Sequence, residues 1–187
     1  MDWMKDLSGL LEQYNGAQPG QAPDTVDDDF NQVAQNAPQP ALSDGLAAAF
    51  RADETPEFGQ MTANLFNNSN PQQQAGLLNM LLRYAGPAIL SRITGGGGGG
   101  GASAGGGGGL SDLINIFKGG QQEVSPEMAQ QIPPEAVQEI ADKAQKEDPS
   151  IVDRISDFYA EHPTLVKSLG AAALTIVLSR LAKKQFG

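Results

Sequence analysis

Apolar residues recur every three or four positions over most of the chain, the spacing that places them on one face of an α-helix. No segment shows the alternating, β-branched pattern of a strand. The pattern therefore predicts an all-α protein. The clearest stripes are Val26, Phe30, Val33 and Ala37; Phe58, Met61 and Leu65; Val137, Ile140 and Ala144; and Ile151, Ile155, Phe158 and Tyr159.

Helix starts are marked by a capping residue followed by proline, whose missing N–H is not needed at the first helical position. The four predicted starts are Thr55-Pro56-Glu57, Asn70-Pro71-Gln72, Ser125-Pro126-Glu127 and Asp148-Pro149-Ser150. Each half closes on its most apolar helix. The first is predicted over 75–85, broken at Gly86-Pro87 and resumed through Ile93, and the second over 164–184.

A glycine-rich tract at 95–109 separates the two halves, and twelve of its fifteen residues are glycine. Such a tract buries no side chain and loses much backbone entropy when ordered, so it predicts a flexible linker. It is no phosphate loop, because neither a preceding strand nor a terminal Gly-Lys-Ser/Thr is present.

The segments on the two sides of this tract resemble each other. Residues 33–38 match 128–133 at an offset of 95, and Ala41-Leu42 falls on Ala136-Val137. Further on, Asn70-Pro71 falls on His162-Pro163 at an offset of 92. We interpret this as a duplication of a small unit of about four helices. The predicted organisation is an N-terminal helix at 1–16, a linker at 17–23, helical units at 24–94 and 110–187, and the Gly-rich linker between them.

The N-terminal segment predicts an amphipathic helix capped by Asp2 and ended by Asn15-Gly16. So short a helix must dock on its own core, on another chain or on a bilayer surface. Its candidate interaction residues are Trp3, Leu7, Leu10, Leu11 and Tyr14.

The net charge of −10 disfavours nucleic acid as a partner, because an acidic surface repels phosphate backbones. The first six residues lack the basic start and apolar core of a signal peptide, so the expected location is the cytosol. No cysteine is present to form a disulfide or a thiolate–metal site.

Candidate chemistry is sparse. Asp24 and Asp27–Asp29 lack the alternating spacing of a calcium loop and suit the first turn of a helix. His162 is the single histidine, and its place before Pro163 makes it a residue at a helix start. We therefore expect no enzyme, no cofactor and no metal site, although carboxylates brought together by folding could still form an acid–base pair.

Basic residues flank the last apolar stretch: Lys167 on one side, and Arg180, Lys183 and Lys184 on the other. An interfacial helix on an anionic membrane has this composition. A core helix with cations at its C-terminal end has it too. Lys167 and Arg180 lie too close together for a bilayer span between them.

Part of the second unit consists of the short motifs Ser125-Pro126-Glu127, Ala129-Gln130-Gln131 and Pro133 to Val137. Together with the short Leu/Gly openings of the two halves at 7–11 and 110–114 and the Gly tract, these residues carry a resemblance to small bacterial YidB-like proteins of unknown function. The resemblance covers the second unit only, without its last apolar helix, and implies a bacterial, helical, non-catalytic protein. Two functions are favoured: a helical interaction or assembly protein with a protein partner or self-association, and a peripheral membrane protein at the inner-membrane surface. A hydrolase-like enzyme that uses His162 or a carboxylate is the third, disfavoured alternative.

Overall fold

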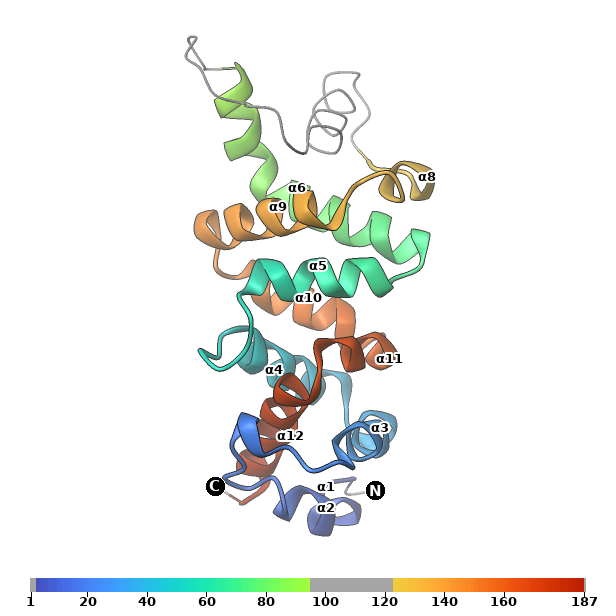
Figure 1. Ribbon diagram of the computed structural model, residues 1–187, viewed down its shortest axis with the longest axis vertical. Helices are drawn as coiled ribbons and strands as arrows, with labels where there is room; N and C mark the ends of the chain where they lie inside the picture. The colour runs from blue at the N-terminus through green and yellow to red at the C-terminus, as the bar shows by residue number, and fades with distance from the viewer. Residues whose placement is uncertain (1–2, 95–122, 187) are drawn as a thin grey trace. The chain divides into compact units, whose positions relative to one another are not determined.

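The computed structural model describes residues 3–94 and 123–186 of the 187-residue chain (Figure 1). Every regular element in those two ranges is helical, and neither range contains a strand. The all-α prediction is therefore confirmed for this part of the protein. The Gly-rich tract at 95–109 and the opening of the second half at Leu110 lie outside the described residues.

The helices form two compact units. Unit 1 consists of residues 1–61 and 152–187, and unit 2 consists of residues 62–151. Each unit thus takes helices from both sides of the Gly tract. This grouping differs from the sequential domains predicted at 24–94 and 110–187. Those boundaries stay a prediction about which residues form the two related halves of the sequence.

Unit 1 is organised around its last helix. Its elements are α1 (Trp3–Asp6), α2 (Ser8–Glu12), the 3₁₀ turn η1 (Pro19–Gln21), α3 (Val26–Asn36), α4 (Gln39–Phe50), α10 (Ile151–Ala160), α11 (Pro163–Val166), the 3₁₀ turn η2 (Lys167–Leu169) and α12 (Ala171–Phe186), with the start of α5 (Phe58–Asn68). Within this unit α12 packs most extensively on α4 and also contacts α2, α3 and η1.

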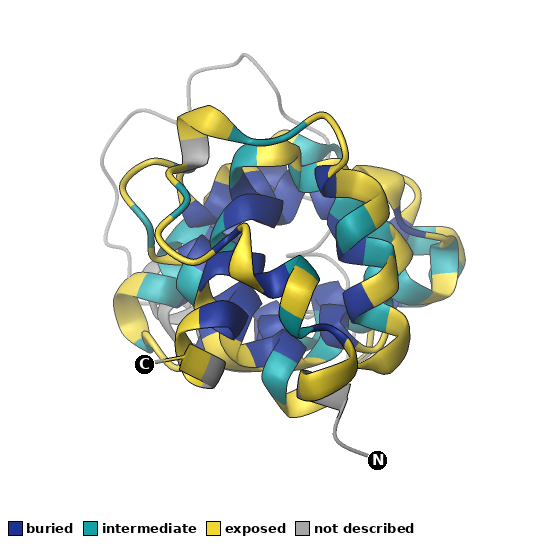
Figure 2. Cartoon of the chain, turned by 90° about the horizontal axis from the view of Figure 1, so that it is seen from below, coloured by how far each residue is buried: buried dark blue, intermediate teal, exposed yellow. Residues whose placement is uncertain are grey.

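Four large apolar side chains of α12 are completely buried, as the core alternative of the sequence analysis expects. Leu174, Val177, Leu178 and Leu181 have no exposed surface. Figure 2 colours such buried positions dark blue and shows them on the inward sides of the helices. Burial of each of these side chains stabilises the fold by about 1.5–3 kcal/mol before entropy is counted.

Two predicted helix boundaries in unit 1 were wrong. The helix predicted over 164–184 is divided into α11, η2 and α12, because Gly170 adopts a φ of +87°, a left-handed conformation that glycine accepts without strain. The N-terminal helix predicted to reach Tyr14 is divided at Leu7 and ends at Glu12.

The close packing of α12 on α4 depends on Gly45. A Cβ atom at this position would lie 2.8 Å from Val177 Cγ1 and 3.2 Å from the Val177 carbonyl oxygen. The two backbones therefore approach more closely than any larger residue allows.

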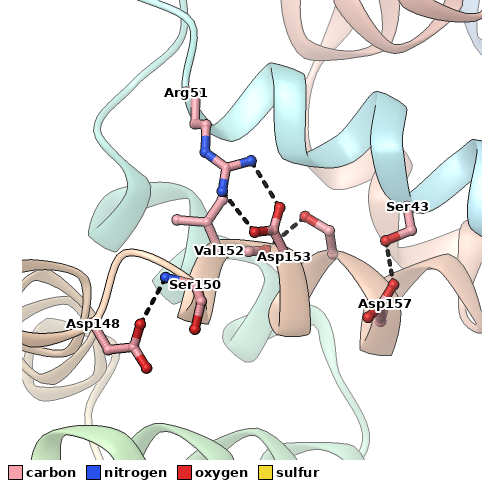
Figure 3. A network of polar contacts seen from close by, with 8 residues as sticks. Ser43, Arg51, Asp148, Ser150, Val152, Asp153 and Asp157 are labelled. Carbon is pink, nitrogen blue, oxygen red and sulfur yellow. Dashed lines mark hydrogen bonds and ion pairs between the residues drawn. The ribbon is translucent and has the colours of Figure 1, made fainter.

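Polar contacts join α4 to α10 along one side of unit 1 (Figure 3). The Arg51 guanidinium donates to both oxygens of Asp153, at 2.8 and 2.9 Å. These hydrogen bonds lower the pKa of Asp153 and raise that of Arg51. Ser43 donates to the Asp157 carboxylate, and Gln39 Nε2 donates to the Glu161 carboxylate at 3.1 Å. Because Arg51 and Asp153 are exposed, their ion pair fixes the register of the two helices more than it adds stability.

Unit 2 contains most of α5, together with α6 (Pro71–Thr94), α8 (Pro126–Ala129) and α9 (Pro134–Glu147). Its α6 packs on α8 and α9. Asn79 of α6 holds the segment before α8 through two hydrogen bonds: its Oδ1 accepts from the Val124 N–H at 2.7 Å, and its Nδ2 donates to the Val124 carbonyl at 3.1 Å. The predicted break at Gly86-Pro87 was wrong, because α6 continues through both residues.

Two of the four predicted helix starts, at Pro71 and Pro126, are confirmed. Asn70 forms a reciprocal capping box with Gln73, at 2.9 and 3.0 Å. Ser125 Oγ accepts a long hydrogen bond from the Met128 N–H, at 3.4 Å. Asp148 accepts from the Ser150 N–H at 2.9 Å, but α10 begins two residues later than the motif predicts, at Ile151. At Thr55-Pro56-Glu57 the helix begins two residues later than the motif predicts, at Phe58.

Replacing Gly45 tests the contact between α4 and α12. Alanine usually stabilises a helix interior relative to glycine by about 0.5–1 kcal/mol. At Gly45 the added methyl group would overlap Val177, so Gly45→Ala should lower the free energy of unfolding by about 1–3 kcal/mol. The matched control is Gly9→Ala in α2, where no atom lies within 4 Å of the new Cβ and a small gain is expected. Equal stability of the two variants in urea unfolding would contradict the close approach.

Cleavage within the Gly tract tests how the units are composed. A protease site placed within 95–109 would cut the folded chain into two pieces, each of which contributes helices to both units. We expect the pieces to stay together and to elute with the mass of the uncut chain in gel filtration with light scattering. Separation into two folded monomeric pieces would instead support independent units at 24–94 and 110–187.

Candidate interaction site at the basic end of α12

The four basic residues of the last stretch have different environments. Lys184 forms an ion pair with Asp44 of α4. Lys167 is half-buried in η2, one turn before α12 begins. Arg180 and Lys183 are exposed on α12 and have no ion-pair partner among the residues that the structure describes. Of the four cations that the sequence analysis singles out, Arg180 and Lys183 are therefore the two available to bind a partner.

Arg180 and Lys183 line an open hollow of about 400 Å³ in unit 1. One wall comes from α12 through Ile176, Ser179, Arg180 and Lys183. These residues share one helix face because they lie three and four positions apart. The opposite walls come from Gly16–Gln18 and from the C-terminal part of α4 and the loop after it, through Ala48, Ala52 and Glu54.

The lining of the hollow combines apolar and polar groups. Its partly exposed apolar residues, called the floor below, are Ala17, Ala48, Ala52 and Ile176. Ser179 is only 8% exposed, and its hydroxyl has no hydrogen bond to any described residue. This hydroxyl is open to solvent, so water or a ligand group can form a hydrogen bond with it. The arrangement can therefore bind an anionic group beside a small apolar side chain.

The predicted N-terminal interaction residues lie mostly inside unit 1. Leu11 and Tyr14 have no exposed surface, Leu7 is 7% exposed, and Leu10 is partly exposed. The side chain of Trp3 lies outside what the structure describes. Because α2 packs on α12, Leu7 and Leu11 form part of the core of unit 1.

Tyr14 also connects the N-terminal segment to α3. Its hydroxyl donates to Asp29 Oδ2 at 2.5 Å, and the same oxygen accepts from Thr25 at 2.9 Å. Burial raises the pKa of Tyr14, and the neighbouring Asp29 raises it further through this hydrogen bond and its charge. Asp27, Asp28 and Asp29 occupy the first turn of α3, as the sequence predicted.

His162 occupies the N-cap position of α11, which confirms its assignment to a helix start. Its ring contacts Phe158 edge to face, with centroids 5.4 Å apart, and makes no capping hydrogen bond. Within residues 3–94 and 123–186, no group of three or more acidic, His or Cys side chains is placed to hold a metal ion.

Comparisons of the chain with protein-family models, with curated proteins and with solved structures gave no match. Across the described part of the protein, no helix combines the length and apolarity that crossing a bilayer requires.

Sequence reasoning missed the hollow because its walls come from three segments far apart in the chain. Only the α12 face had a signal, the spacing of Ile176, Arg180 and Lys183. Nothing in the sequence indicated that Glu54 and Gln18 would lie on the opposite walls.

Tyr14→Phe tests the link between the N-terminal segment and α3. Loss of a hydrogen bond to a carboxylate should lower the free energy of unfolding by about 1–2 kcal/mol at neutral pH. The native pKa of Tyr14 is raised, so its contribution is fully present below about pH 10, where an unfolded tyrosine starts to ionise, and is lost as the pH rises further. The difference between wild type and variant should therefore shrink above about pH 10 in urea unfolding.

The control for this pH dependence is Ser156→Ala in α10, which removes a buried hydrogen bond to the Val152 carbonyl in the same unit and is not among the groups that shift the pKa of Tyr14. Its stability deficit should stay constant over the same alkaline range. A constant deficit for Tyr14→Phe as well would contradict the raised pKa.

Proposed function

We propose that the chain is a non-enzymatic, bacterial helical interaction or assembly protein of the cytoplasm, with a protein as its partner. The observation that carries the proposal is the hollow, where Arg180 and Lys183 stand beside a partly apolar floor. Such a surface has the features of a binding site: concave shape, exposed apolar area and a few convergent polar groups. The acidic net charge and the presence of Glu54 in the same hollow weigh against nucleic acid.

The proposal includes two related helical halves. Residues at the offset of 95 in α4 and α9 share their burial, as in the pairs Leu42 and Val137, Leu46 and Ala141, and Ala49 and Ala144. The helices that match each other in sequence order also have matching neighbours. In unit 1, α12 packs on α3 and α4, and in unit 2, α6 packs on α8 and α9. These parallels support a duplication in which each half completes the other's unit.

The resemblance to YidB-like proteins is consistent with this proposal, since it implies a bacterial helical protein without catalysis. An enzymatic role would need a nucleophile with a base, or a pair of carboxylates, at a pocket. The hollow contributes a single carboxylate, Glu54, and its Ser179 has no base beside it among the described residues.

The alternative is a peripheral membrane protein. The observation that favours it is Phe186, which is 46% exposed at the end of α12, close in sequence to Lys183 and Lys184. Against it, the apolar face of α12 is buried within unit 1, so a single phenylalanine would have to carry the insertion.

Site-specific photo-crosslinking in the native cells tests the interaction function. A photoreactive residue at Gln18 would lie at the hollow without altering Arg180 or Lys183, and a matched one at Lys146, an exposed cation of α9, would lie away from it. We expect a discrete product heavier than the 19.6 kDa chain from Gln18 alone. Twice the chain mass would identify self-association. The absence of a product from Gln18, or the same product from both positions, would overturn the proposal.

A further inference from the structure

The hollow beside α12 differs in charge from the rest of the molecule. The chain has ten more acidic than basic side chains, yet this hollow has two cations, Arg180 and Lys183, and one acid, Glu54. Neither cation is neutralised by a described neighbour, whereas nearby Lys184 is paired with Asp44. A partner with negative charge is therefore attracted to this part of unit 1 against the repulsion of the rest of the surface.

The apolar floor restricts what the partner can be. Ala48, Ala52 and Ile176 leave exposed carbon surface in the same hollow as the cations. An inorganic anion would leave this surface in contact with water. A side chain the size of leucine would cover it while neighbouring carboxylates reach the cations.

Ser179 and Glu54 supply hydrogen-bonding groups to the hollow. The Ser179 hydroxyl is open to solvent and can donate to, or accept from, a main-chain group of a bound segment. The Glu54 carboxylate accepts hydrogen bonds, and a main-chain N–H would supply one. Donors and acceptors together match a peptide backbone better than they match a uniformly anionic ligand.

From these observations we propose that the hollow binds a short acidic peptide segment of a partner protein, with one apolar side chain on the floor and flanking carboxylates at Arg180 and Lys183. This inference deepens the proposed interaction function and rests on it. The binding is weak and salt-dependent, because the cations are exposed.

Fluorescence anisotropy of the full chain tests the proposal directly. The probe is a short fluorescein-labelled peptide of glutamates interrupted by single leucines. Two matched probes carry lysine in place of glutamate, or serine in place of leucine. We expect saturable binding of the Glu/Leu peptide that weakens with added salt, weaker binding of the Glu/Ser peptide, and none of the lysine peptide. Equal binding of the Glu/Leu and lysine peptides would overturn the proposal.

Substitutions locate the binding. Arg180→Ala and Lys183→Ala should each lower the affinity for the Glu/Leu peptide roughly two- to fivefold, the range typical of exposed ion pairs. Lys146→Ala, which removes the same charge from unit 2, should leave the affinity unchanged. Ala52→Leu fills the floor without changing charge, so it should lower the affinity for the Glu/Leu peptide more than the affinity for the Glu/Ser peptide. Unchanged affinity in all three hollow variants, with urea unfolding confirming that they are folded, would overturn the assignment.

Two competitors separate the other occupants. If inorganic phosphate displaces the peptide at a concentration similar to that of the peptide, the hollow is a site for small anions and the peptide proposal is rejected. Binding to phosphatidylglycerol vesicles that is lost in Arg180→Ala, without peptide binding, would reject it in favour of a membrane. If the peptide does not bind but the crosslinked product from Gln18 is observed, the proposal of an acidic segment is rejected while the proposed interaction function stands.

Discussion

The burial of α12 against α4 is the contact on which unit 1 depends. The helix presents Leu174, Val177 and Leu178 to the interior, and Gly45 allows its backbone to approach α4 closely. Whole domains have a net stability of about 5–15 kcal/mol, so a contact that buries several such side chains is a large part of what holds the unit together. The position of the hollow follows from it, since one wall of the hollow is the outer face of the same helix.

The sequence predicted the helical class and most helix positions because these depend on local signals. The Asn70-Pro71 and Ser125-Pro126 motifs begin α6 and α8, and the apolar spacing of Val137, Ile140 and Ala144 marks the buried face of α9. The errors arose where local rules compete with packing. Gly86-Pro87 signals a break in a free helix, yet α6 continues through it, and Gly170 divides a stretch that its apolar composition joined.

The composition of the units could not be predicted in the same way. Both halves carry the same kinds of amphipathic helix, so pairing α4 with a helix of its own half or with α12 satisfies the hydrophobic pattern equally well. Shape decides between them, as at Gly45 and Val177, and shape is not readable from the order of apolar residues. For the same reason the sequence selected Arg180 and Lys183 but did not predict that they share a hollow with Glu54.

The discontinuous composition of unit 1 has a consequence for biosynthesis. Residues 1–61 leave the ribosome first, but the helices that cover their apolar faces belong to residues 152–187, and all of 62–151 is made in between. At about 5–20 residues per second, the nascent N-terminal helices wait several seconds with Leu11, Phe30 and Leu46 uncovered. During translation these apolar side chains therefore stay uncovered until residues 152–187 have been made, so the two segments of unit 1 complete their core only at the end of synthesis.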